Sequence, residues 1–153
     1  MAPLAFLQSN PIADLLNNTE WGFAIAECFH IVFFGVAIGT IMIVDLRLLG
    51  LAFPRKTSAK LLQDTWAYTW IALAVTVLAG MALFLSDPRM YYFSPWFRFK
   101  AIALLLAILY NYTIHSKVAS SATSPRVGVV VGGISVLLWV SVVTGGLFTG
   151  LLA

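Results

Sequence analysis

A carboxylate and an imidazole stand inside a long apolar segment near the start of the chain. Glu27 and His30 interrupt the run of 23 residues from Gly22 to Val44. At about 100° per residue in a helix, Glu27 and Asp45 both fall roughly 60° to the same side of His30. Charged and polar groups in hydrocarbon cost several kcal/mol each unless they are paired, hydrated or ligated. This polar stripe is therefore expected to face the interior of a helix bundle, and we take it as the candidate functional site.

Three kinds of chemistry suit His30. It could be a neutral structural side chain, hydrogen-bonded to Glu27 one turn earlier. It could ligate a metal or a haem, because imidazole is the usual ligand inside membranes and a neighbouring carboxylate can orient it. It could also relay protons, as histidines in membrane spans do.

A second polar stripe lies on a later apolar segment. Lys100 and Asn111 fall roughly 60° and 40° to one side of His115 when the segment is a helix. Because each of these two helices carries one polar stripe, we expect both stripes to face the same interior of the helix bundle. Lys100 and Glu27 both lie near the outer ends of their helices, so we expect them to form a buried ion pair.

The inner ends of the two striped helices carry further polar groups. Asp45 and Arg47 end the first helix, and Asn111 and His115 end the other. We expect Asp45 or Arg47 to meet His115 or Asn111 there. His115 could also be an interfacial anchor, and both histidines are candidate metal ligands.

The two histidines are predicted to lie at different depths. With a rise of 1.5 Å per residue, His30 is about 13 Å from Trp21, whereas His115 is about 27 Å from Phe97 at the same outer surface. A haem with two axial ligands from one chain needs level histidines, so this spacing disfavours a haem held by both.

Length and composition set the fold class. The chain has 153 residues, of which 61% are hydrophobic and 10% charged, too few polar groups for the surface of a water-soluble fold. We predict an all-α, four-helix integral membrane bundle, with residues 1–153 forming a single transmembrane domain. The predicted spans are 21–47, 65–86, 96–115 and 127–152. Asn10 before Pro11 predicts a short N-terminal helix, which either lies on the membrane surface or extends the first span at its N-terminal end.

The basic residues predict the orientation in the membrane. Six of them flank the first and third loops and three flank the second, so the positive-inside rule places both termini in the periplasm of a bacterial inner membrane. The net charge of +3 comes from these loops and gives no reason to expect a nucleic-acid partner.

Pairs of glycines four residues apart predict close helix packing. Gly35 and Gly39 fall on the face of the first helix opposite His30, at roughly 140° and 180° from it. The last helix has two further pairs: Gly128 with Gly132, and Gly146 with Gly150. We expect these faces to support a homo-oligomer.

Several short motifs resemble those of a known group of proteins. The motifs are Glu27-x-x-His30, Gly39, Asp45-Leu-Arg47-Leu-Leu-Gly50 and Arg98-x-Lys100. They resemble small, largely uncharacterised bacterial four-helix inner-membrane proteins, and are distantly similar to the membrane domain of copper-resistance D proteins. The resemblance implies a four-helix membrane bundle and, in the copper-resistance relatives, a histidine at the position of His30.

The leading hypothesis is a membrane subunit that carries electrons on a redox centre, b-type haem, bound by His30 with Glu27 and Lys100 beside it. Asn111 and His115 are further candidate cofactor contacts. A second copy of the chain could supply the other axial ligand, or the haem could be five-coordinate. The chain is not expected to be an enzyme on its own; it would serve a redox partner protein. The alternatives are a copper-handling or transport-related protein and a structural or assembly subunit without a cofactor.

Overall fold

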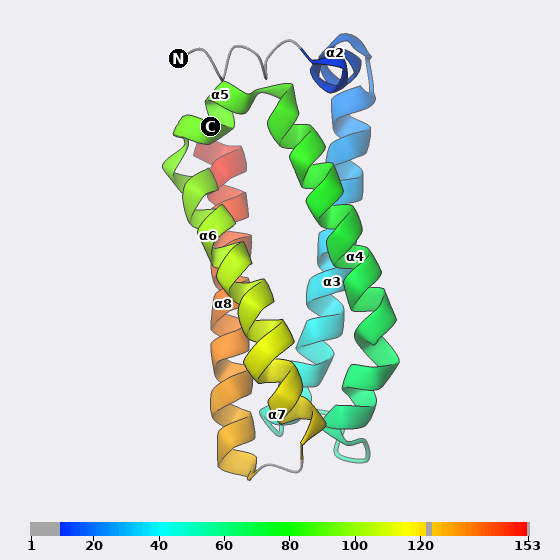
Figure 1. Cartoon of the computed structure of the whole chain (residues 1–153), viewed down its shortest axis with the longest axis vertical. Coiled ribbons are helices and arrows are strands. Elements are labelled where there is room, and N and C mark those ends of the chain that lie inside the picture. The colour runs from blue at the N-terminus through cyan, green and yellow to red at the C-terminus, as the bar shows by residue number, and fades with distance from the viewer. Residues whose placement is uncertain (1–9, 122–123, 153) are drawn as a thin grey trace.

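The computed structural model describes residues 10–121 and 124–152, and these residues form helices joined by short turns (Figure 1). Four helical segments are long and apolar enough to cross a membrane: α3 (Gly22–Leu48), α4 (Ser58–Ser86), the segment Pro95–Ser120, and α8 (Pro125–Leu152). The predicted all-α, four-helix membrane bundle is confirmed for this part of the chain.

Three helices begin with the same local signal, a capping side chain followed by proline. Asn10 accepts a hydrogen bond from the Ala13 amide at 2.8 Å and opens α2 (Pro11–Asn18), the short N-terminal helix that the sequence predicts. Asp87 opens α5 (Pro88–Phe93), and Ser94 opens α6 (Pro95–Tyr110). Proline suits the first helical turn because the amide it lacks has no partner there. Helix α5 was not predicted, because a helix of six residues between two spans is too short to show a periodic pattern.

Two helices are longer than the spans predicted from hydropathy. Helix α4 begins at Ser58 rather than at 65, because Thr57 caps a helical start whose polar residues Lys60, Gln63 and Asp64 lower the mean hydropathy. The third segment does not end at His115. It continues through a π-helical turn, η1 (Asn111–His115), into α7 (Ser116–Ser120). Between the predicted spans 96–115 and 127–152, residues 116–120 and 125–126 are therefore helical.

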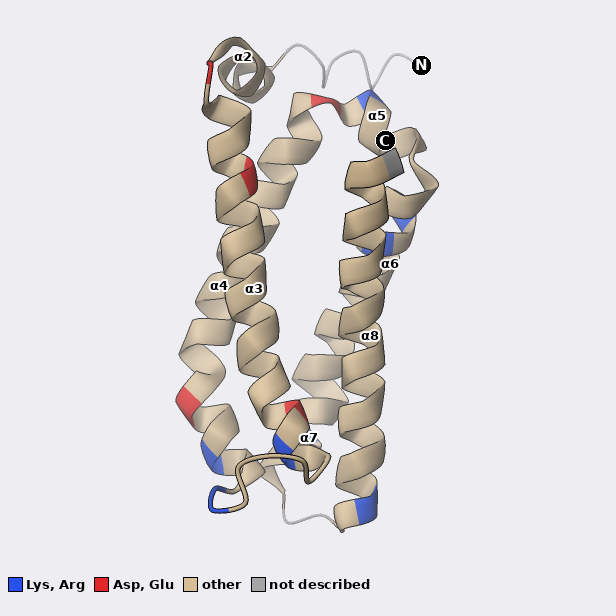
Figure 2. Ribbon diagram, turned by 180° about the vertical axis from the view of Figure 1, so that it is seen from behind, with Lys and Arg blue, Asp and Glu red and all other residues tan. Residues whose placement is uncertain are grey.

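The bundle consists of two helical hairpins. Helix α3 packs mainly against α4, and α6 packs mainly against α8; α3 also contacts α8, and α7 contacts α4. Figure 2 shows the two pairs from behind, with α3 and α4 on one side and α8 and α6 on the other. The core that joins them consists of small and branched side chains around one tryptophan: Ala37, Ile41, Ala72, Leu73, Ala103, Ala107, Trp139 and Val142.

Basic residues lie toward both ends of the bundle, on α5 and α6 and, in larger number by sequence, at the end where α7 lies (Figure 2). The end of α3 and the beginnings of α4 and α8 meet there, and they carry Arg47, Lys60 and Arg126. Helix α2 and the end of α8 lie at the opposite end of the molecule (Figure 1). This arrangement fits the predicted positive-inside orientation, which stays a prediction.

The glycine pairs differ in what they contact. A Cβ atom added at Gly132 would lie 3.1 Å from the Cβ of Leu48 and 3.2 Å from the Asp45 carbonyl oxygen, so Gly132 lets α8 approach α3 within one chain. Added Cβ atoms at Gly35 and Gly39 would meet nothing within 4 Å. The predicted homo-oligomer would use this open face of α3, and it stays a prediction.

Candidate functional site

His30 projects from α3 onto α4. Its Nδ1 lies 2.9 Å from the backbone oxygen of Thr76. Because a carbonyl oxygen can only accept, Nδ1 carries the proton and donates it, which leaves a lone pair on Nε2. Phe34, one turn further along α3, stacks parallel to the imidazole at a centroid distance of 6.2 Å.

The Nε2 atom of His30 faces Lys100 on α6. Lys100 Nζ lies 3.4 Å from this nitrogen, so the ammonium group donates to the imidazole lone pair across the two hairpins. The lysine side chain runs along α8, where added Cβ atoms would lie 3.3 Å from its Nζ at Gly146 and 3.0 Å from its Cβ at Gly145. These two glycines make room for the lysine.

Gly80 forms the wall behind the imidazole. A Cβ atom added to Gly80 would lie only 2.9 Å from Cε1 and 3.1 Å from Nδ1 of His30. Thr76 and Gly80 are one turn apart on α4, so one face of this helix both bonds and contacts the ring. Neither residue was predicted as part of the site, because an apolar helix shows no charge or periodicity that marks them.

Glu27 does not make the predicted ion pair with Lys100. The Glu27 side chain is exposed on the surface of the single chain. Within the described residues, no hydrogen bond or ion pair joins it to Lys100 or to His30. The prediction was wrong because the lysine side chain extends along α8 to reach His30 instead. Glu27 lies close to Tyr91 on α5. Burial, together with the negative charges of Glu27 and Asp87, raises the pKa of the Tyr91 phenol above its usual value.

A second polar centre lies near the end of the bundle where α7 lies, and we call it the inner centre after the predicted orientation. The Asp45 carboxylate accepts a hydrogen bond from Nε2 of His115 at 2.7 Å and another from the Ser135 hydroxyl at 2.9 Å. The three residues come from α3, η1 and α8, and each is 0% or 1% exposed. The predicted meeting of Asp45 with His115 is confirmed. Ser135 was missed, because a hydroxyl among valines and leucines gives no signal in the sequence.

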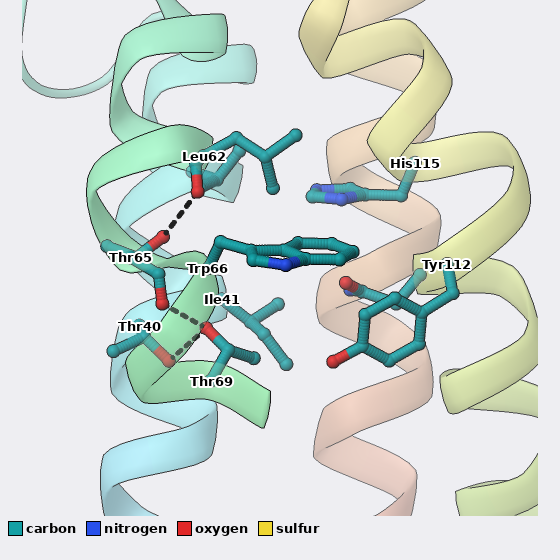
Figure 3. A pocket seen from close by; sticks show the side chains of 10 residues that line it. Thr40, Ile41, Leu62, Thr65, Trp66, Thr69, Tyr112 and His115 are labelled. Carbon is teal, nitrogen blue, oxygen red and sulfur yellow. Dashed lines mark hydrogen bonds between the residues drawn. The ribbon is translucent and has the colours of Figure 1, made fainter. Parts of the chain in front are cut away.

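The π-helical turn positions the other candidate residues of this centre. Its hydrogen bond runs from the Ser116 amide to the Asn111 carbonyl, and both Asn111 and His115 are buried. Arg47, the alternative partner, instead donates from Nε to the Lys56 carbonyl. Figure 3 shows His115 and Tyr112 directed from this segment toward Trp66 of α4. Short π-helical turns occur often at functional sites.

The two histidines belong to separate centres. His30 contacts Thr76 and Lys100, whereas His115 contacts Asp45, so the chain does not bring the imidazoles together. Within residues 10–121 and 124–152, no three His, Cys, Asp or Glu side chains form a group that could hold a metal ion. A metal at either histidine would need ligands of another kind or from another molecule.

The sequence matches a known protein family, described as a family of unknown function (DUF6644), over residues 19–152. The chain belongs to this family. The match begins just before α3 and ends with α8, so both polar centres of this DUF6644 chain lie within it. No curated protein and no solved structure matches the chain. The resemblance to copper-resistance D proteins finds no support in these matches and stays a prediction.

Proposed function

We propose that this protein is a membrane subunit that binds b-type haem through Nε2 of His30 and carries electrons to or from a redox partner protein. The observation that carries the proposal is the hydrogen bond from His30 Nδ1 to the Thr76 carbonyl. Histidines that ligate metals usually donate their other ring N–H to a carbonyl or carboxylate oxygen, which fixes the tautomer and the ring orientation.

The surroundings of Nε2 also support a haem. Among the described residues, the one close polar neighbour of Nε2 is the Lys100 ammonium, whose Nζ lies 3.4 Å away. An ammonium group on a long side chain can move from the imidazole to a carboxylate, and haem carries two propionates. Phe34 and Gly80 pack against the imidazole itself and hold the orientation of its ring.

The coordination number follows from the separation of the two histidines. His115 already donates from Nε2 to Asp45, so it leaves His30 as the axial ligand in one chain. The haem would be five-coordinate, or a second copy would supply its own His30. The open face at Gly35 and Gly39 lies on the side of α3 opposite His30, so a homo-oligomer packed there would leave a five-coordinate haem in each chain, and a shared haem would need contact through another face. The six basic residues near the inner loops support a bacterial inner membrane with both termini periplasmic.

A visible spectrum of the full chain purified in detergent tests the proposal. A reduced-minus-oxidised difference spectrum should show sharp Soret and α bands, and His30→Ala should remove them. Arg98→Met, an exposed change on α6, is the matched control and should keep them. A flat spectrum from folded protein made with ample haem would reject the proposal, as would full haem content in His30→Ala.

The inner centre favours a second candidate function, a structural or assembly subunit without a cofactor. Asp45, His115 and Ser135 lock three helices together through buried hydrogen bonds and need no ligand to do so. Metal analysis of the purified protein distinguishes the candidates. Iron at about one atom per chain supports haem, copper supports the copper-handling alternative, and neither metal supports the structural role.

A further inference from the structure

We propose that a small cavity beside the inner centre binds one water molecule, which bridges Asn111 and His115. This site is separate from the proposed haem site and does not depend on it. The cavity lies between α3, α4 and η1 and is seen from close by in Figure 3.

The cavity has the size of a single water. The volume open to the centre of a water-sized sphere is about 10 Å³, and a site of about 10–15 Å³ measured in this way holds one water molecule. The residues around it include three threonines and the ends of the π-helical turn: Thr40, Thr65, Thr69, Asn111, Tyr112 and His115. A larger organic ligand does not fit this volume.

Two buried nitrogens in the wall lack a hydrogen-bond partner among the described residues. They are Nδ2 of Asn111 and Nδ1 of His115, whose side chains are 5% and 1% exposed. Leaving such groups unpaired costs about 1–3 kcal/mol each. Buried water molecules are found where several buried polar groups are otherwise unsatisfied.

The two nitrogens are complementary to one water. His115 donates from Nε2 to Asp45, so in the neutral ring Nδ1 is an acceptor, whereas Asn111 Nδ2 is a donor. A water oxygen can accept from Asn111 while one of its hydrogens is donated to His115. The hydrogen bonds then run without a break from Ser135 through Asp45, His115 and the water to Asn111.

A metal ion is a poorer occupant of this cavity. No group of three His, Cys, Asp or Glu side chains surrounds it in the described part of the chain. The Asp45 carboxylate is already engaged by His115 and Ser135. Water needs only the donor and the acceptor that are present.

Nuclear magnetic resonance of the full chain in lipid bilayers tests the site. The protein has two histidines, so ¹⁵N-histidine labelling gives few signals, and His30→Ala identifies those of His115. We expect Nδ1 of His115 to resonate as a hydrogen-bonded acceptor and to receive magnetisation from water. Asn111→Leu, which removes the donor and fills the cavity, should abolish this transfer. Thr113→Val, an exposed change in the same turn, should preserve it.

The measurement on the unmodified protein decides the matter even where Asn111→Leu fails to fold. A His115 Nδ1 signal at the position of an unbonded imine nitrogen, without transfer from water, would overturn the proposal. A hydrogen-bonded Nδ1 that receives no magnetisation from water would also overturn it, because a protein group would then be the partner.

Discussion

The outer polar centre (His30, Thr76 and Lys100) and the inner polar centre (Asp45, His115 and Ser135) each contain one histidine, but the hydrogen bonds of the two histidines differ. His115 is fully buried and donates to a carboxylate that also accepts from Ser135, so a buried negative charge is hydrogen-bonded on both oxygens. His30 is half-buried, and its lone pair faces a lysine ammonium without a bonded acid beside it. The inner centre links three helices through hydrogen bonds that pair its groups with one another. The outer centre leaves the Lys100 ammonium without an acidic partner, which a bound anionic group would supply.

The comparison indicates that the two centres respond oppositely to mutation. Removing one member of a paired buried cluster leaves the others unsatisfied and destabilises the protein. Removing an uncompensated buried cation relieves a desolvation cost. Natural proteins keep such costly groups chiefly where function requires them.

The largest effect is expected from Asp45→Ala. This change leaves His115 and Ser135 buried without their acceptor, and we expect the free energy of unfolding to fall by about 3–5 kcal/mol. Unfolding by sodium dodecyl sulfate in mixed micelles measures the change. Asp64→Ala removes exposed ion pairs to Lys56 and Lys60 and is the control, with little change expected. Equal effects of the two variants would contradict the assignment of the inner centre as a lock.

A smaller effect is expected from Gly132→Ala, which presses on the same centre from α8. The new Cβ would lie 3.2 Å from the Asp45 carbonyl oxygen, and overpacking of this kind costs about 1–3 kcal/mol. At the neighbouring Gly133 an added Cβ meets nothing within 4 Å. Gly133→Ala should therefore leave stability unchanged or raise it by up to about 1 kcal/mol, through the helix propensity of alanine. The same unfolding assay compares the two, and a loss of stability only in Gly133→Ala would refute the packing argument.

Lys100→Met tests the outer centre. Methionine keeps much of the length of the side chain but removes the cation that faces His30. We expect the free energy of unfolding to stay the same or to rise by about 1 kcal/mol, while the haem content or the haem spectrum changes. A stability loss comparable to that of Asp45→Ala would show that the outer centre is also a structural lock.

The smallest effect on stability is expected from Gly80→Ala. Alanine gains about 0.8–1 kcal/mol of helix propensity, which offsets the contact of its Cβ with Cε1 of His30 at 2.9 Å. The imidazole must shift, so the ¹⁵N signals of His30 should move while those of His115 stay. Gly39→Ala, whose Cβ would be open, should move neither. Unchanged His30 signals in Gly80→Ala would remove Gly80 from the site.

The parts of the fold that follow from composition and helical period were predictable. The four membrane helices and the meeting of Asp45 with His115 come directly from apolar length and from stripes of charged residues. Thr76, Gly80 and Ser135 were not predictable in the same way. They act through a backbone oxygen, a missing side chain and a hydroxyl, none of which marks a helix face in an apolar sequence.

The partner of Lys100 shows where counting along helices fails. The predicted pair with Glu27 depended on depths counted along straight helices from one surface, and such depths do not give the direction in which a long side chain turns. The observed contact with His30 depends on the path of a flexible side chain over Gly145 and Gly146. The π-helical turn at Asn111–His115 likewise has no recognisable signal in its five residues.

The division into two hairpins bears on how the protein is made. The α3–α4 hairpin carries His30, Thr76 and Asp45, and the later half of the chain carries Lys100, His115 and Ser135. Two contacts join the halves: Lys100 donates to His30, and Asp45 accepts from His115 and Ser135, so these partners meet only after the halves have docked. We therefore expect a chain whose halves have not docked to leave Asp45 without its hydrogen bonds from His115 and Ser135, and to be less stable in the bilayer than the assembled bundle.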